Sequence, residues 1–270
     1  MLPVVLIKGR NGARVWERSI VETFRRGVLV ETEYNQMSKD LTMIMVIKEP
    51  LREPRIHISG LMLGKMEDLE VYAKEIVEGI HDSWVREGKW SYSYHDRMTA
   101  YPTPKGETVD QIEYIVKKLS EVPYSRRAQA ITWVPWHDPK IDDAPCLQRV
   151  SCRIYNDKLV METSWRSRDA YKAAHMNIYA MTELQKFIAK RISEETGREI
   201  KVGEYVDFSN YYHIYERDWR DVEERFLRML EKRPFRTKTD KVTGRVIVRG
   251  RAITTEQYRR MISPKRLRGD

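Results

Sequence analysis

The segment from Ala144 to Asn177 holds the residue types best suited to chemistry in this chain of 270 residues. Pro145 fixes its own φ and disfavours the helical region for Ala144, so Cys146 is expected to begin an extended segment. A cysteine at the start of a strand is held in place and can be reached. The thiolate is the reactive form, and a nearby guanidinium, for which Arg166 is the candidate, favours it. The pattern predicts a nucleophile beside an anion site.

A structural interpretation competes with this chemical one. Free cysteine is often buried and behaves as a small apolar side chain. Cys152 fits that interpretation, because it lies further along one apolar run that also contains Cys146. Period-two alternation along an extended chain would place both thiols on one face. Spacing alone therefore does not separate a nucleophile from a core residue.

The neighbours of Cys146 separate the two, because they resemble the thymidylate synthase family. In that family Pro-Cys supplies the nucleophile, Arg-Ser and Asp follow on the next strand, and Asn follows the Asp within the next helix. This chain shares the family's order and spacing of residues from about Ile80 to Tyr215. The matching residues are Tyr94, Ala100-Tyr-Pro-Thr-Pro-Lys-Gly106, Tyr124-Ser-Arg-Arg127, Pro145-Cys146, Arg166-Ser167, Asp169, Asn177, Val202-Gly-Glu-Tyr-Val206 and His213-Ile-Tyr215. Each piece is weak alone, but their order makes the resemblance specific.

The resemblance implies a thymidylate synthase-type methyltransferase that converts dUMP to dTMP. Carbon 5 of uracil is a poor nucleophile, and addition of the Cys146 thiolate to C6 would activate it. The implied co-substrate is 5,10-methylenetetrahydrofolate or a related methylene-pterin, which supplies both the carbon and a hydride. No metal is expected, since the Cys and His residues are too scattered for a zinc site.

The resemblance also assigns roles to single residues. Asn177 carries a donor and an acceptor in one amide, which complements O4 and N3 of uracil; a helix-surface amide is the alternative. The resemblance implies that Tyr94 helps to remove the C5 proton through water, and that His213 and Tyr215 bind the sugar 3′-hydroxyl. It also implies that the phosphate is bound by Arg126, Arg127, Arg166 and Ser167, and that the pterin is contacted by Asp169 and Trp84. A core tyrosine with a satisfied histidine is the alternative for Tyr215 and His213, and a core aromatic at a helix end is the alternative for Trp84. The adjacent pair Arg126 and Arg127 would reach the partner's pocket, which implies a homodimer with shared active sites.

Several positions depart from the family's pattern. Its amino-terminal phosphate loop is missing, and the chain reads Gly27-Val-Leu-Val-Glu-Thr-Glu-Tyr34 in that region. The family's catalytic glutamate falls on Ile58, His81 replaces a tryptophan on the cofactor side, and Leu147 replaces the histidine after the nucleophile. The nucleotide half of the site is therefore intact, whereas the cofactor half is altered.

This asymmetry leaves three functions open. The first is an archaeal-type thymidylate synthase acting on dUMP, with a modified pterin such as a methanopterin as carbon donor. The second is a pyrimidine-nucleotide 5-hydroxymethylase on the same fold. The third is a non-catalytic nucleotide- or RNA-binding relative. Cys146 and Tyr94 speak against the third, since a binder needs neither.

Composition agrees with an enzyme of the reducing cytoplasm. Two cysteines provide no disulfide framework, and no apolar stretch is long enough to span a bilayer. The net charge of +9 comes from 49 basic and 40 acidic residues whose signs are interspersed, so we expect no nucleic-acid partner. Basic residues are in excess only near the end. We expect one domain over residues 1–270, with a basic C-terminal extension at about 235–270.

The predicted fold class is α+β, and the resemblance specifies a mixed β-sheet packed by a long central helix, with a sheet-mediated dimer. Helical spacing predicts helices at Ala13–Arg26, Met66–Trp84, Thr108–Ser120, Ala170–Thr196 and Asp218–Lys232. Strands are predicted at Pro3–Lys8, Val28–Tyr34, Leu41–Ile47, Ala128–Val134, Cys146–Tyr155 and Lys158–Trp165. Asn156-Asp157 is the predicted turn between the last two strands, and Lys241–Ile253, with Thr243-Gly244, suggests a terminal hairpin.

Overall fold

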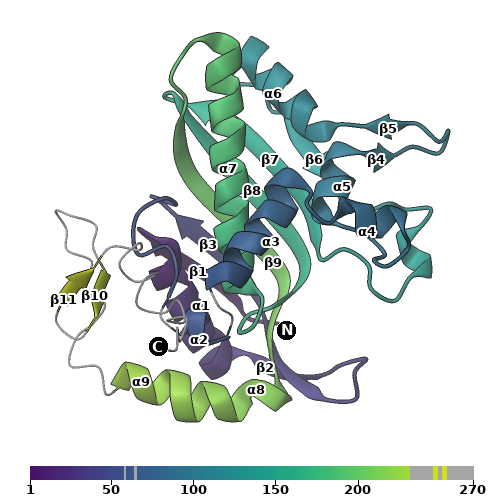
Figure 1. Cartoon of the computed structure of the whole chain (residues 1–270). Coiled ribbons are helices and arrows are strands. Elements are labelled where there is room, and N and C mark those ends of the chain that lie inside the picture. The colour runs from purple at the N-terminus through teal and green to yellow at the C-terminus, as the bar shows by residue number, and fades with distance from the viewer. Residues whose placement is uncertain (58, 64–65, 232–245, 249–250, 254–270) are drawn as a thin grey trace, which may run out of the picture.

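The computed structural model describes residues 1–57, 59–63, 66–231, 246–248 and 251–253 (Figure 1). Within them the strands are β1 (Val4–Gly9), β2 (Val28–Glu31), β3 (Met37–Ile47), β4 (Tyr101–Pro102), β5 (Thr108–Val109), β6 (Gln129–Ile131), β7 (Leu147–Tyr155), β8 (Lys158–Asp169), β9 (Lys201–Tyr215), β10 (Val246–Val248) and β11 (Arg251–Ile253). The helices are α1 (Gly12–Arg26), α2 (Gly60–Leu63), α3 (Met66–Glu78), α4 (Asp82–Arg86), α5 (Tyr94–Thr99), α6 (Gln111–Glu121), α7 (Ala174–Thr196), α8 (Glu216–Asp221) and α9 (Arg228–Glu231), with a 3₁₀ turn at Asp138–Lys140 and a π-helical segment at Val222–Leu227.

A mixed sheet of seven strands organises the molecule. Its order is β1-β3-β9-β8-β7-β6, and β2 pairs with β3. β1 runs parallel to β3 and β8 runs parallel to β9, whereas the other pairs are antiparallel. The sheet confirms the predicted α+β class. Its two central strands, β8 and β9, carry five of the eleven predicted site residues.

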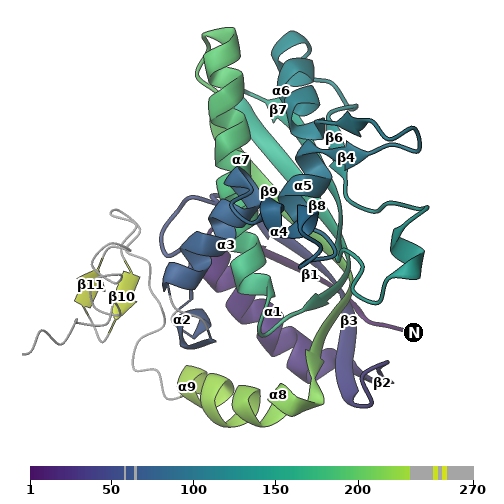
Figure 2. The same cartoon turned by 45° about the vertical axis from the view of Figure 1, so that its right-hand side comes forward.

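Helices α1, α3 and α7 lie on one face of this sheet in both views (Figures 1 and 2). The long helix α7 is buried along most of its length and packs against β8, β9, α1, α3 and α6, as predicted for the central helix. The fully buried rings of Trp16 in α1 and Trp165 in β8 belong to this core. Burial of such large apolar side chains is the main term that holds the layers together.

The opposite face of the sheet carries apolar side chains that stay accessible. In β1, Val4 is 64% exposed and Leu6 is 53% exposed, whereas the alternating Val5 and Ile7 are buried. In β3 and β9 the same alternation leaves the outward residues half-buried, among them Ile44, Val46, Val206 and Phe208. A sheet face of this character is typical of an interface.

Some predicted elements differ from the observed ones. The helix predicted over Met66–Trp84 is two helices, because Gly79 adopts a positive φ of 64° between α3 and α4. The helix predicted from Ala170 begins at Ala174, since the Asp169 carboxylate accepts the N–H groups of Tyr171 and Lys172 in a turn before it. The predicted turn at Asn156-Asp157 is present, with φ of 50° and 54°, values typical of a type I′ hairpin.

The C-terminal predictions are only partly open to comparison. Strands β10 and β11 form an antiparallel pair, which agrees with the predicted terminal hairpin. Thr243-Gly244 and most of the basic extension predicted at about 235–270 lie outside the described residues. In the part of the chain that the structure describes, no helix is both long and apolar enough to cross a membrane.

Candidate active site

A cavity of about 660 Å³ opens where the ends of β8 and β9 meet α7 and the loop before β7. Of the residues predicted from the sequence, it is lined by Tyr94, Cys146, Arg166, Ser167, Asp169, Asn177, His213 and Tyr215. These residues span more than a hundred positions of the chain, yet the fold brings them to one wall. Arg126, Arg127 and Trp84 do not line it.

Cys146 lies immediately before β7 and is half-buried. Arg166 on the neighbouring strand fixes this stretch of backbone: its Nε donates to the Pro145 carbonyl at 3.1 Å and its Nη2 to the Ala144 carbonyl at 2.6 Å. The Arg166 N–H also donates to the Cys146 carbonyl at 2.8 Å. The arginine therefore holds the thiol in position through the main chain.

The two cysteines lie in different surroundings. The register between β7 and β8 shifts between Leu147 and Arg149, so the regular alternation along the strand is interrupted between them. Cys146 lines the cavity and packs against the edge of the hydrophobic core, while Cys152 is 3% exposed and belongs to that core.

Arg166 acts on the Cys146 thiol in the expected direction, but burial outweighs it. Burial raises the pKa of its thiol, and Asp143 adds to that effect, whereas Arg166 and Arg168 lower the pKa. The net direction is upward, so the guanidinium moderates the cost of burial without overcoming it. For Cys152, burial raises the pKa to about 12, which makes this thiol unreactive near neutral pH.

Tyr94 stands at the first turn of α5, next to the cysteine. Its hydroxyl accepts the Leu147 N–H at 3.3 Å, and its ring meets the Trp165 ring edge-on at 5.9 Å between centroids. Burial raises the pKa of this phenol well above its ordinary value. Tyr94 is therefore a neutral hydroxyl held beside Cys146, with a proton to donate or to relay.

Asn177 is fixed by two partners deep in the cavity. Its Oδ1 accepts from Arg168 Nε at 3.2 Å, and its Nδ2 donates to the Tyr72 hydroxyl at 2.7 Å. Arg168 in turn bonds both carboxylate oxygens of Asp207 at 2.5 Å and the Ala174 carbonyl at 3.0 Å. Arg168 and Asp207 are 3% and 0% exposed, so this ion pair is a buried and rigid support.

His213 and Tyr215 project from β9 onto the cavity, as their spacing predicts, and their rings meet at 4.5 Å between centroids. His213 Nδ1 lies 3.1 Å from the Tyr211 carbonyl, so this nitrogen carries the proton. Its buried Nε2 has no partner among the described residues and is left as an acceptor. A ligand hydroxyl is the group that would satisfy it.

Asp169 closes the same end of the cavity at the end of β8. Its pKa is raised, chiefly by burial, although the N–H groups of Lys172 and Tyr171 and the nearby His213 work in the opposite direction. With Oδ1 used in the turn before α7, the carboxyl group is held in one orientation. It is suited to bind a ring that presents N–H donors.

The mouth of the cavity is acidic in the region that corresponds to the family's phosphate loop. Glu31, Thr32, Glu33 and Tyr34, at the end of β2 and in the turn after it, line the cavity with the buried Asp40 of β3. Asp40 accepts a short hydrogen bond from Ser38 and pairs in register with His213. This hairpin supplies no arginine to the cavity, in agreement with the sequence.

The predicted residues outside the cavity occupy two other places. Arg126 lines a separate hollow with Ser151 and Glu162, residues of the accessible sheet face, and Arg127 follows it in the loop before β6. Trp84 stacks on His81 at 4.0 Å between ring centroids and meets Trp90 at 4.9 Å. Ile58, at the position of the family's glutamate, lies outside the described residues.

A second hollow adjoins the main cavity. It has a volume of about 360 Å³, and it shares Tyr72, Tyr94 and Asp143 with the cavity. Its other walls include Trp90 and Tyr92. These aromatic surfaces can stack on a flat ring.

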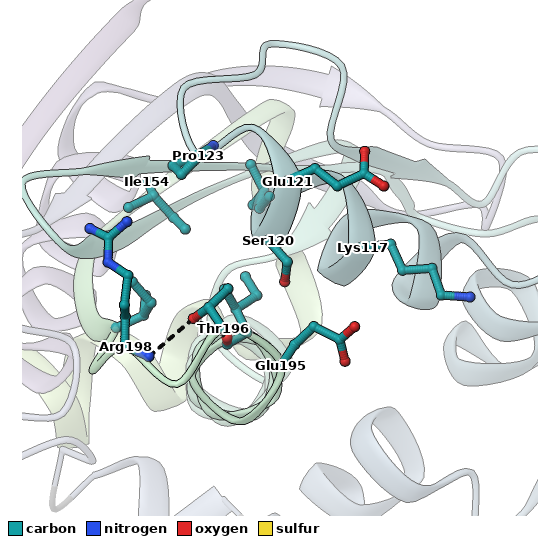
Figure 3. Close-up of a pocket in the computed structure, with 11 residues that line it drawn as sticks. Lys117, Ser120, Glu121, Pro123, Ile154, Glu195, Thr196 and Arg198 are labelled. Carbon is teal, nitrogen blue, oxygen red and sulfur yellow. Dashed lines mark hydrogen bonds between the residues drawn. The ribbon is translucent and has the colours of Figure 1, made fainter.

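A further hollow of about 420 Å³ lies between the ends of α6 and α7, in a separate part of the fold. Its rim mixes Lys117 and Arg198 with Glu121 and Glu195. The hydrogen bond marked in Figure 3 runs from the Arg198 main-chain N–H to the Thr196 hydroxyl. None of the predicted residues lines it. Its chemistry is that of an ordinary surface groove.

Sequence reasoning missed Tyr72, Arg168 and Asp143 among the residues of the main cavity. Tyr72 follows the helical spacing of α3, so it was indistinguishable from a core residue. Arg168 gave a better signal, because a charged residue inside a buried strand needs a partner, and Asp207 occupies a comparable place in β9.

Comparison with known proteins places these residues in a wider group. A family model described as thymidylate synthase matches residues 34–258. A protein of Methanosarcina mazei is 31% identical over 221 residues, which cover 81% of this chain and 93% of that protein. A protein of Methanosarcina acetivorans is 30% identical over 219 residues, which cover 81% and 93%. A protein of Methanocaldococcus jannaschii is 30% identical over 231 residues, which cover 83% and 96%. Each of the three is named "Putative thymidylate synthase".

Proposed function

The chain belongs to the thymidylate synthase family, and on that premise we propose that it converts dUMP to dTMP by reductive methylation with a methylene-pterin as carbon donor. One observation carries the proposal: a single cavity is lined by a half-buried thiol, a neutral phenol, a fixed amide and an imidazole nitrogen that has no partner in the described part of the chain. Each of these groups answers one chemical need of the reaction.

Cys146 is the nucleophile in this proposal. Its Sγ adds to C6 of uracil, and the electron pair of the C5–C6 double bond moves toward O4, which makes C5 nucleophilic. After C5 has gained the one-carbon unit, its proton leaves through water held at the Tyr94 hydroxyl. The bond from the new carbon to the pterin nitrogen must then break, and that carbon must receive the hydride that the pterin supplies, before it is a methyl group. Departure of Sγ as a thiolate restores the C5–C6 double bond of the ring. Arg166 supports the step by fixing the main chain at the thiol and by lowering the thiol pKa.

The nucleotide is held by the remaining residues of the wall. Asn177 reads the uracil edge through its amide, and His213 Nε2 accepts the sugar 3′-hydroxyl beside Tyr215. Arg166 and Ser167 face the phosphate at the end of β8. Guanidinium forks suit phosphate oxygens, so we propose that Arg126 and Arg127 of a partner subunit bind the remaining phosphate oxygens.

We propose that the accessible sheet face forms the homodimer interface. Val4, Leu6 and the half-buried residues of β3 and β9 supply its apolar surface. Arg126 borders this face beside Ser151 and Glu162, from which it can extend toward a second copy. A symmetric pairing through one face would place each Arg126 near the other subunit's cavity.

The co-substrate would bind between Asp169 and the adjoining aromatic hollow. When bound, a methylene-pterin supplies the carbon and the hydride. The raised pKa of Asp169 and the rings of Trp90 and Tyr92 suit a pterin with N–H donors. Trp84 would act behind this wall through its contact with Trp90. The altered positions His81, Leu147 and Ile58 support a donor other than ordinary folate.

Product analysis tests the proposal. The protein is incubated with dUMP and either methylenetetrahydrofolate or a methylene-methanopterin, and the nucleotides are separated and weighed by mass spectrometry. We expect dTMP, with a higher kcat for the modified pterin. A product with one additional oxygen would identify the 5-hydroxymethylase instead. Unchanged dUMP with every donor, despite nucleotide binding, would contradict an enzymatic function.

A further inference from the structure

The orientation of the Asn177 amide is set by one neighbour. An asparagine side chain can be turned over, exchanging its oxygen and its nitrogen, and both orientations fill the same space. The two orientations differ only in the hydrogen bonds that they make. Which of them prevails therefore depends on the groups that surround the amide.

The two neighbours of this amide differ in kind. The Tyr72 hydroxyl is 2.7 Å from Nδ2, and a hydroxyl can accept or donate, so it tolerates either orientation. Arg168 Nε, 3.2 Å from Oδ1, carries a hydrogen and can only donate. Turning the amide over would bring two donors together and leave both without an acceptor.

Arg168 has no freedom to adapt to a turned amide. Its Nη1 bonds both oxygens of Asp207, its Nη2 bonds the Ala174 carbonyl at 3.0 Å, and its guanidinium lies 4.5 Å from the centre of the Trp165 ring. The side chain is 3% exposed, so water does not replace any of these partners. The direction of Nε–H is thus determined by the fold.

We propose that Arg168 is a positioning residue that makes the site specific for uracil over cytosine by locking the Asn177 amide in one orientation. This inference rests on the proposed role of Asn177 as the reader of the base. In the locked orientation Oδ1 can also accept from uracil N3–H, and the second hydrogen of Nδ2 can be donated to uracil O4. Cytosine presents an acceptor at N3 and an amino group at C4, so it requires the turned amide.

The size of the effect follows from the bond that the turned amide loses. A hydrogen bond from a charged donor, broken with both partners left buried, corresponds to a discrimination of roughly tenfold to a hundredfold in affinity. Arg168 would contribute this factor without touching the nucleotide.

The test compares dissociation constants for dUMP and dCMP, measured by calorimetry without a carbon donor. Arg168→Lys keeps a cation beside Asp207 but lacks the fork that also reaches Asn177. We expect its preference for dUMP to fall about tenfold or more, mainly through tighter dCMP binding. The double variant Arg168→Met/Asp207→Asn removes donor and charge together and should show the same loss. It also serves if Arg168→Lys does not fold.

Tyr72→Phe is the matched control, because it removes a partner from both orientations alike. Its preference should stay within about twofold of the wild type, even if both nucleotides bind more weakly. An unchanged preference in the folded Arg168 variants, or a comparable loss in Tyr72→Phe, would overturn the lock.

A second readout does not depend on nucleotide binding. The side-chain amide protons of Asn177, observed by NMR in the free protein, should exchange slowly in the wild type and faster in Arg168→Lys. If the wild type binds neither nucleotide, the proposed function fails, and this measurement still decides on the lock. Equal exchange in both proteins would contradict it.

Discussion

Selective alkylation tests how burial and nearby charges set the reactivity of the Cys146 thiol. Iodoacetamide reacts with thiolates, so the rate at each cysteine follows its ionised fraction and its exposure. Cys152 has a pKa of about 12 and is 3% exposed, which leaves roughly one thiolate in ten thousand at pH 8. Cys146 is half-buried and has two arginines that lower its pKa. We expect its alkylation to be faster by several orders of magnitude.

Two substitutions should move this rate in opposite directions. Arg166→Met removes a cation that lowers the thiol pKa, so the thiolate fraction at pH 8 falls and alkylation slows. Asp143→Asn removes an anion that raises the same pKa, so alkylation quickens. Because burial keeps the pKa above its ordinary value, the wild-type rate should still rise with pH beyond the range in which a free cysteine levels off.

Arg166→Met also leaves the Ala144 and Pro145 carbonyls without their donor, and each charge-assisted bond contributes about 1.5–3 kcal/mol when buried. Partial exposure of Arg166 reduces this, so we expect a loss of roughly 1–3 kcal/mol in the free energy of unfolding. Asp143→Asn has no such structural effect and isolates the electrostatic one. The assay is peptide mass spectrometry after timed alkylation. Comparable rates at Cys146 and Cys152, or no acceleration in Asp143→Asn, would refute the reasoning.

Three further substitution experiments follow from the site. Asn177→Asp should lower kcat/KM for dUMP by roughly tenfold to a hundredfold and improve the use of dCMP, and an unchanged ratio would remove Asn177 from the base site. Homodimers of Cys146→Ala and of Arg126→Glu should each be inactive. Random mixing of the two should restore up to about a quarter of the wild-type activity, because half of the dimers are then mixed and each mixed dimer has one intact pocket. No recovery despite proven subunit exchange would place Arg126 outside the partner's site. Arg168→Met should reduce the free energy of unfolding by about 3–5 kcal/mol, since it leaves Asp207 buried and unpaired, and Arg168→Met/Asp207→Asn should recover most of that loss in urea titrations.

Local sequence signals predicted most of the elements that hold the site. The Asn156-Asp157 turn is an example, because two residues that tolerate positive φ fix the β7–β8 hairpin and with it the distance between Cys146 and Arg166. The order of Pro145-Cys146, Arg166-Ser167 and Asn177 predicted a common site, and Cys146, Arg166, Ser167 and Asn177 do line one cavity. Such signals depend only on neighbours in the chain.

The remaining features depend on contacts between distant segments. The shift in register after Leu147 interrupts the alternation between Cys146 and Cys152, and such an irregularity leaves no mark in composition. The balance at the thiol also could not be predicted, because burial outweighs Arg166 only in the folded chain. Tyr72 and Arg168 contact Asn177 from α3 and β8. The hydrogen bonds that hold the Asn177 amide therefore form only once the helices have packed on the sheet.

The most direct test of the central claim follows the hydrogen at C5 of the substrate. The protein is incubated with dUMP carrying tritium at C5 and with a methylene-pterin, and tritiated water and dTMP are counted in the same sample. We predict equal amounts of the two with the wild type and with Cys152→Ser, and neither with Cys146→Ser, although that variant should still bind dUMP. Tritium release and dTMP formation by Cys146→Ser at the wild-type rate would contradict the assignment of Cys146 as the nucleophile.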